Sequence, residues 1–111
     1  MPQTKEEIKS KRLYKTYGIN IDDFNRMLQE QEGVCWICKT LPKSGVLCCD
    51  HLHVKGYKKM DPSERRKYLR GLVCFGCNTV FARFERRKNP RFIMGRVIEY
   101  FKQFPMKGDV I

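Results

Sequence analysis

Two Cys-x2-Cys pairs constrain the fold of this chain more than any other feature of its sequence. The pairs are Cys35/Cys38 and Cys74/Cys77, and residues 39–73 lie between them. Four thiolates in two such pairs supply the closed tetrahedral ligand set that structural Zn²⁺ prefers. Zinc binding contributes roughly 10–16 kcal/mol in zinc-finger peptides, which is comparable with the stability of a whole domain. The spacing therefore predicts a structural zinc site that the fold requires and that has no open position for catalysis.

Length and charge limit what the rest of the chain can do. A chain of 111 residues is expected to form one compact domain with little room for a buried ligand. We expect an N-terminal helical region (residues 1–33), a zinc-bound core (34–88) and a C-terminal helix with its tail (89–111). The 23 Lys and Arg residues outnumber the 12 Asp and Glu residues, which gives a net charge of +11. Such an excess favours a polyanionic partner, and nucleic acid is the commonest one.

The compartment is predicted from what the sequence lacks. No stretch approaches the roughly 18 consecutive apolar residues of a membrane span, and the N-terminus lacks the apolar core of a signal peptide. The prediction is an intracellular, cytoplasmic protein without a membrane partner. Six cysteines in a reducing compartment are more readily explained by metal binding than by three disulfides.

Periodicity and capping signals predict an α+β fold. Residues 6–17 carry a helical apolar stripe that ends at Gly18, and a second helix starts after Asn20, where Asp23 completes a capping box. Strands are predicted over residues 46–50 and 70–73, with a short helix beginning near Asp61 and Pro62. Helices are also predicted from the second cysteine pair to Lys88, and from Asn89 to Pro105.

The residues that could bind a metal ion or transfer a proton lie between the cysteine pairs and just after them. Asp50, His51 and His53 follow the first predicted strand, and Asn78 follows the last cysteine. Carboxylate and amide oxygens are hard donors that suit Mg²⁺ or Mn²⁺, and a neutral imidazole can accept a proton from water. Because zinc would join the strand to the helix, these side chains can meet although they are distant in sequence. A bound metal ion and a proton acceptor are the groups that phosphodiester cleavage needs.

The ordered motifs carry a family resemblance. Cys-x2-Cys, then Asp-His-x-His, then Arg-Gly-Leu-Val-Cys-x2-Cys-Asn resembles the phage recombination endonuclease VII family of the HNH (ββα-metal) nucleases, from about Tyr17 to about Phe101. The resemblance implies a small ββα-metal, treble-clef-like core with flanking helices. It departs from the family at Leu52, where a second acidic residue is usual, and in the longer connection over residues 54–69.

The resemblance also implies residue roles. Zn²⁺ would bind Cys35, Cys38, Cys74 and Cys77. A catalytic Mg²⁺ or Mn²⁺ would bind Asp50 and Asn78, His51 would act as the general base, and His53 would contact the scissile phosphate or support the site. If the protein is encoded by a phage, its location would be the cytoplasm of the host cell.

Several residues have simpler interpretations. Asn78 could cap the helix that follows the cysteines, and Cys48 and Cys49 could either be plain strand residues or join a second metal cluster. Trp36 and the C-terminal aromatic residues are expected in the core. A basic set is predicted to contact phosphates in part, although each member could be a solvated surface charge: Arg65, Arg66, Lys67, Arg70, Arg83, Arg86, Arg87 and Lys88.

Two hypotheses of different class follow. The first is a metal-dependent DNA endonuclease that uses a histidine-activated water to nick DNA, with branched or junction DNA as one option for its substrate. The second is a non-catalytic, zinc-dependent module that binds nucleic acid. Both predict zinc, a basic surface and steep salt dependence, but only the nuclease needs Asp50, His51 and Asn78 together with a divalent ion. The sequence is compatible with either a monomer or a homodimer.

Overall fold

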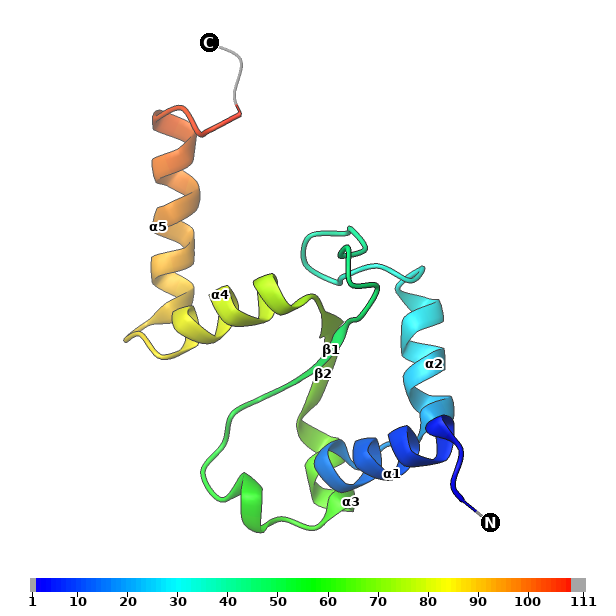
Figure 1. Ribbon diagram of the computed structural model, residues 1–111. Coiled ribbons are helices and arrows are strands. Elements are labelled where there is room, and N and C mark those ends of the chain that lie inside the picture. The colour runs from blue at the N-terminus through cyan, green and yellow to red at the C-terminus, as the bar shows by residue number, and fades with distance from the viewer. Residues whose placement is uncertain (1, 109–111) are drawn as a thin grey trace. The chain divides into compact units, whose positions relative to one another are not determined.

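Helices and one small sheet make up the chain in the computed structural model, which describes residues 2–108 (Figure 1). The predicted α+β class is confirmed. The elements in chain order are α1 (Lys5–Tyr17), α2 (Ile21–Glu30), β1 (Cys48–His51), the 3-10 turn η1 (Tyr57–Lys59), α3 (Pro62–Arg65), the 3-10 turn η2 (Arg66–Tyr68), β2 (Leu69–Val73), α4 (Phe75–Glu85) and α5 (Pro90–Gln103).

The chain divides into two compact units. The first comprises Met1–Asn78 and the second Thr79–Ile111, so that α4 contributes its first residues to one unit and the remainder to the other. The predicted segments 1–33, 34–88 and 89–111 of a single domain stay a prediction. Within residues 2–108, the structure contains no helix with the length and apolar character of a membrane span.

Local capping signals explain where α1 and α2 begin and end. Gly18 adopts a left-handed conformation (φ 77°) after α1, and its N–H donates to the carbonyl of Tyr14. Asn20 Oδ1 accepts from the N–H of Asp23 at 2.8 Å, and the Asp23 carboxylate accepts from the N–H of Asn20 at 3.1 Å. The predicted stop and the predicted capping box are both confirmed.

The core of the first unit lies where α1 and α2 pack against the sheet. Ile19 and Leu72 are almost fully buried, the first between the two helices and the second on β2. Cys49 on β1 is also buried while Cys48 is half-buried, as expected for neighbouring residues on one strand. The remaining buried apolar members are Leu13, Phe24, Cys35, Leu47 and Val73.

The sheet contains a bulge near the end of β1. Strands β1 and β2 are antiparallel, with Cys49 opposite Leu72 and His51 opposite Leu69. Between these pairs β1 has one residue, Asp50, whereas β2 has residues 70–71. An extra residue in one strand bends that strand and redirects a side chain, and such bulges are frequent next to active sites.

A glutamine closes the outer edge of β2. The Gln31 side-chain amide donates to the carbonyl of Leu72 at 2.9 Å and accepts from its N–H at 2.9 Å. The same amide donates to the carbonyl of Val34. These bonds satisfy backbone groups that an edge strand would otherwise leave exposed. Gln31 thereby connects the end of α2 to the sheet and to the segment that carries the first cysteine pair.

Two expectations about aromatic burial are wrong. The Trp36 side chain is 57% exposed. Its ring packs over Gly71 of β2, and the ammonium group of Lys39 lies over the ring, but within residues 2–108 no layer of apolar side chains covers it. The predicted core aromatic residues of the second unit are also exposed: Phe92, Tyr100, Phe101 and Phe104. Helix α5 has no buried residue among those described, so its apolar side chains lack the layer that would cover them.

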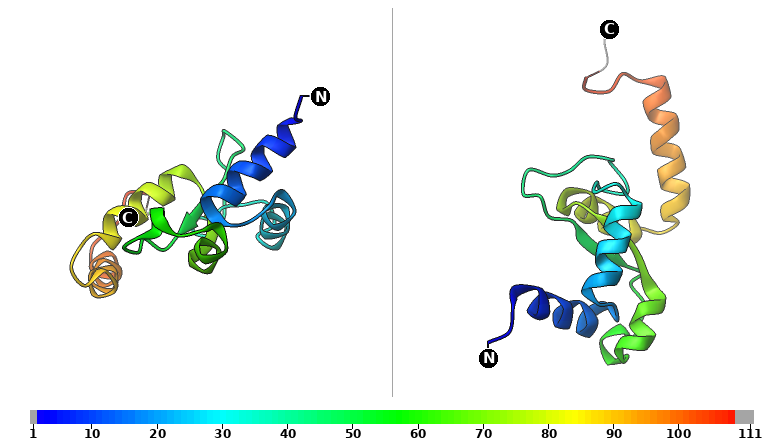
Figure 2. Two further views of the ribbon diagram at one scale, coloured as in Figure 1. Left: turned by 90° about the horizontal axis from the view of Figure 1, so that it is seen from below. Right: turned by 90° about the vertical axis from the view of Figure 1, so that its right-hand side faces the viewer.

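Gly18→Ala is expected to destabilise the first unit by about 2–5 kcal/mol. The left-handed backbone costs a non-glycine residue about 1–2 kcal/mol, and overpacking adds about 1–3 kcal/mol. A Cβ at Gly18 would lie 2.0 Å from the carbonyl oxygen of Pro62, a backbone atom of α3, which lies beside the end of α1 (Figures 1 and 2). Denaturant unfolding of the full chain measures the change.

Gly33→Ala is the matched control for Gly18→Ala. Gly33 has nearly the same backbone angle (φ 75°), but a Cβ there would meet nothing within 4 Å. This variant should therefore show only the backbone cost of about 1–2 kcal/mol. If the two variants lose the same free energy of unfolding, the steric role of the α1–α3 contact is refuted.

Candidate metal centre and active site

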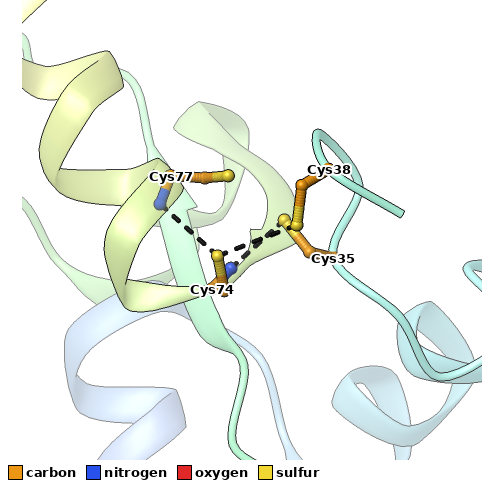
Figure 3. A group of neighbouring side chains, drawn as sticks. All are labelled: Cys35, Cys38, Cys74 and Cys77. Atoms are coloured by element: carbon orange, nitrogen blue, oxygen red, sulfur yellow. Dashed lines mark hydrogen bonds between the residues drawn. The ribbon is translucent and has the colours of Figure 1, made fainter. Parts of the chain in front are cut away.

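The four cysteines converge on one point of the first unit. Cys35 and Cys38 come from the turn after α2, while Cys74 and Cys77 come from the junction of β2 and α4 (Figure 3). All four sulfur atoms lie within 4.8 Å of one another, and those of Cys38 and Cys74 are 4.0 Å apart. A tetrahedron with metal–sulfur bonds of about 2.3 Å has edges of about 3.8 Å. The cluster therefore fits one tetrahedral metal ion.

Backbone N–H groups stabilise negative charge in this cluster. The N–H of Cys74 donates to Cys35 Sγ at 3.3 Å, and that of Cys77 donates to Cys74 Sγ at 3.4 Å. Burial opposes ionisation of Cys35, but hydrogen bonds from the backbone of Cys38, Cys74 and Ile37 outweigh it and lower its pKa to about 6. Burial and the neighbouring sulfurs raise the pKa of Cys77 to about 12. A cation bound among these sulfur atoms would favour the thiolate form of all four.

Asp50 is buried in the bulge of the sheet and paired with an arginine. Its carboxylate Oδ2 lies 2.7 Å from Nε of Arg70, and Oδ1 accepts from Nη2 of Arg70 at 3.0 Å. The side chain of Asp50 is 10% exposed and that of Arg70 is 27% exposed. One hydrogen bond and one close ion-pair contact thus hold the carboxylate against the guanidinium. Arg70 is therefore engaged with Asp50, whereas the sequence predicted a phosphate contact for it.

The two histidines lie together at the end of β1. Their ring centroids are 4.7 Å apart, and the ring of His51 stacks on that of Tyr57 at 4.2 Å with an interplanar angle of 18°. The ring centroid of Tyr17, on α1, lies 5.8 Å from that of His51, and the two rings are tilted by 55°. The histidines and Tyr57 line a cavity of about 430 Å³, together with Val54, Gly56, Lys58 and Lys59. This cavity combines a possible proton acceptor with exposed positive charge.

Asn78 lies inside α4 rather than at its cap. The helix begins at Phe75, and the N–H of Asn78 donates to the carbonyl of Cys74 at 2.9 Å. The capping interpretation of Asn78 is therefore wrong. Because Asn78 directly follows Cys77, its backbone position depends on the cysteine cluster. The structure thus brings His51 and His53 together, whereas the described bonds pair Asp50 with Arg70 and tie Asn78 into its own helix.

Comparison with known families decides the assignment. The family model for recombination endonuclease VII matches residues 10–103. This chain belongs to the recombination endonuclease VII family. The match spans both cysteine pairs, both histidines and Asn78, and membership in a nuclease family makes nucleic acid the substrate class. No curated protein and no solved structure matches the chain with significance.

Two arginines with a predicted role in nucleic-acid binding have structural partners in this endonuclease VII family chain. Arg65 donates to the carbonyl of Lys15 at 2.6 Å and to that of Lys58 at 2.8 Å. Arg66 Nη1 lies 3.3 Å from the carbonyl of Gly18 and 3.0 Å from the carboxylate of Asp23. These arginines therefore fix the connection before β2 to the end of α1, which presents unpaired carbonyls.

Asp23 receives a second stabilising contact through this connection. The backbone N–H of Asn20, and after it the hydrogen bond from Arg66, lower the pKa of the Asp23 carboxyl below its ordinary value. The carboxylate therefore stays charged and holds both the capping box and Arg66.

The other predicted phosphate contacts are exposed: Lys67 in the first unit, and Arg83, Arg86, Arg87 and Lys88 in the second. Nucleic-acid contact by the basic set stays a prediction.

Sequence reasoning missed residues in the connection over residues 54–69. Its sequence predicts a polar connection that is longer than usual for the endonuclease VII family. In the structure its η1 turn places Tyr57, Lys58 and Lys59 around His51. Gly56 was the signal available in the sequence, because glycine permits the left-handed conformation (φ 84°) that the chain adopts just before η1.

Proposed function

We propose that this chain is an HNH-type (ββα-metal), metal-dependent DNA endonuclease in which His51 is the general base. Family membership supports a nuclease, and one observation carries the residue assignment: His51 and His53 line a cavity with Lys58 and Lys59, next to the strand that holds Asp50. A nuclease needs a proton acceptor beside a phosphate-binding surface. This cavity offers both on one unit.

Zinc has a structural role in this proposal. Zn²⁺ bound by Cys35, Cys38, Cys74 and Cys77 would join the turn after α2 to the start of α4. Four protein ligands complete its tetrahedral coordination, so it has no position for water or substrate. Its contribution to catalysis is to hold the first turn of α4, which contains Asn78, beside the turn after α2.

The hydrolysis step transfers one proton to His51. Water forms a bond to the scissile phosphorus, the bond from phosphorus to one bridging oxygen breaks, and the imidazole takes a proton from the water while the leaving oxygen takes a proton from solvent. The products carry a phosphate end and a hydroxyl end. The donor chemistry of Asp50 and Asn78 suits Mg²⁺ or Mn²⁺, which would stabilise negative charge on the phosphate oxygens. Arg70 orients the carboxylate of Asp50 and adds positive charge beside it.

Replacing both Lys58 and Lys59 by Ala is expected to weaken DNA binding and its salt dependence. Each lost phosphate contact reduces the slope of log K against log salt by about 0.9, so two contacts reduce it by about 1.8. Both lysines are exposed at the cavity of His51. Fluorescence anisotropy with a labelled duplex at several salt concentrations measures the slope.

The matched control replaces two exposed lysines of α1, Lys5 and Lys11. This variant makes the same change in net charge away from the cavity. If both double variants reduce the slope equally, then general charge rather than the cavity explains binding. That result would remove Lys58 and Lys59 from the proposed interface.

One observation favours a non-catalytic nucleic-acid-binding module as the second candidate. Asp50, the proposed ligand of the catalytic ion, is paired with Arg70 through both carboxylate oxygens. In a binding module this pair would serve only to fix the bulge of the sheet. The module would still need zinc and a basic surface.

Nicking of supercoiled plasmid separates the two candidates. The zinc-loaded chain is incubated with plasmid in Mg²⁺, in Mn²⁺ or with no added divalent ion, and DNA binding is measured in parallel. Nicking that requires one of the added ions supports the nuclease. Tight, salt-sensitive binding without cleavage in any of these conditions refutes the nuclease and supports the module.

A further inference from the structure

We infer that Tyr57 is a positioning residue that holds the His51 imidazole through a link to the C-terminal end of α1. The inference rests on the proposed role of His51 as the base. The rings of Tyr57 and His51 are nearly parallel, with an interplanar angle of 18° and centroids 4.2 Å apart. Two flat rings in this arrangement gain dispersion energy and restrict rotation of each other.

Tyr57 is itself held at three points. Its hydroxyl donates to the carbonyl of Thr16 at 2.6 Å, and its own carbonyl accepts from Nε of Arg65 at 3.2 Å. The guanidinium of Arg65 also lies over the Tyr57 ring, 5.2 Å from its centroid. Burial raises the pKa of Tyr57, so its hydroxyl keeps the proton that it donates. The ring therefore has little freedom to move away from His51.

The anchor of Tyr57 is the last turn of α1. Thr16 lies one residue before the end of this helix, and Arg65 donates to the carbonyl of the preceding residue, Lys15, at 2.6 Å. Carbonyls in the last turn of a helix lack partners within the helix. Two side chains of the connection before β2 satisfy two of them, which fixes the connection to α1 at a defined register.

Sharp positioning matters for a general base. The imidazole nitrogen must lie within hydrogen-bond reach of the attacking water, and displacement by about 1 Å can cost about 10²-fold in rate. His51 is the last residue of β1, and the backbone after it is also held, because the N–H of Leu52 donates to the carbonyl of Tyr68 at 2.8 Å. The strand and this bond fix the backbone of His51, whereas rotation of its ring is limited by neighbouring side chains, among which Tyr57 stacks on it. The connection over residues 54–69 thus restricts movement of the proposed base, His51.

The test compares Tyr57→Leu and Tyr57→Phe in the full, zinc-loaded chain. Leu removes the stacked ring, and we expect kcat for DNA cleavage to fall about 10–100-fold with KM changed by less than about threefold. Phe keeps the ring and loses the bond to Thr16, so its loss should stay below about tenfold. Tyr14→Leu, a change at an exposed tyrosine of α1, should leave kcat unaltered.

NMR of the histidine side chains gives a readout that does not depend on cleavage. In the wild type, the ring protons of His51 should show nuclear Overhauser contacts to the ring of Tyr57 and an upfield ring-current shift. Both should persist in Tyr57→Phe and disappear in folded Tyr57→Leu. This readout separates the inference from the proposed function, because it stands even if the wild type does not cut DNA.

Two results would overturn the role of Tyr57. One is a wild-type spectrum without contacts between the rings of His51 and Tyr57, which also decides the case if Tyr57→Leu does not fold. The other is a folded Tyr57→Leu protein that keeps the wild-type kcat in a chain that cuts DNA.

Discussion

Removal of zinc from the four-cysteine site is expected to unfold the first unit, and Cys74→Ser is expected to do so even when zinc is supplied. Structural zinc contributes roughly 10–16 kcal/mol, whereas small domains have total stabilities of about 5–15 kcal/mol. The buried apolar core is small and includes Cys35 itself. Circular dichroism during titration with a chelator measures the unfolding, and mass spectrometry measures zinc content.

Cys48→Ser is the matched control for Cys74→Ser. Cys48 lies on β1, is half-buried and does not belong to the four-cysteine cluster. We expect this variant to bind one zinc ion and to lose less than about 1 kcal/mol of stability. A chelated wild type that keeps its cooperative unfolding transition would contradict the structural role of zinc. Equal zinc loss in Cys48→Ser would contradict the ligand assignment.

The parts of the fold that follow from local chemistry could be predicted from the sequence. The capping box of Asn20 and Asp23 depends on residues three positions apart, and the left-handed Gly18 depends on one residue. The two Cys-x2-Cys pairs also carry their own geometry, since Cys35 and Cys38 lie in one short turn and Cys74 and Cys77 lie at the start of α4. Such signals need no knowledge of distant contacts, and the structure agrees with them.

The parts that depend on long-range contacts could not be predicted. The pairing of Asp50 with Arg70 requires the bulge between β1 and β2, and nothing in the local pattern around Arg70 distinguishes it from a surface arginine. The stack of Tyr57 on His51 depends on a turn that is fixed to α1. Trp36 was expected in the core because it is aromatic, yet its place between Cys35 and Cys38 leaves more than half of the side chain exposed.

His51→Ala is expected to lower the rate of DNA cleavage about 10²–10⁴-fold and to leave DNA affinity almost unchanged. This is the range that a positioned general base contributes. Removal of the ring eliminates the proton acceptor, while Lys58 and Lys59 remain at the same cavity. His53→Ala is the matched control, since it removes the neighbouring imidazole from that cavity and is expected to cost less. Rates on a labelled duplex, measured with the zinc-loaded variants, give both values.

The most direct measurement of the central claim is single-turnover cleavage of a DNA duplex bound in advance to zinc-loaded protein, started by addition of Mg²⁺ or Mn²⁺. We predict that the wild type cuts only after one of these ions is added. We predict that His51→Ala binds the same duplex and cuts it at least about 10²-fold more slowly. Equal rates in the two proteins would exclude His51 as the base, and bound DNA that the wild type does not cut with either ion would contradict the nuclease assignment.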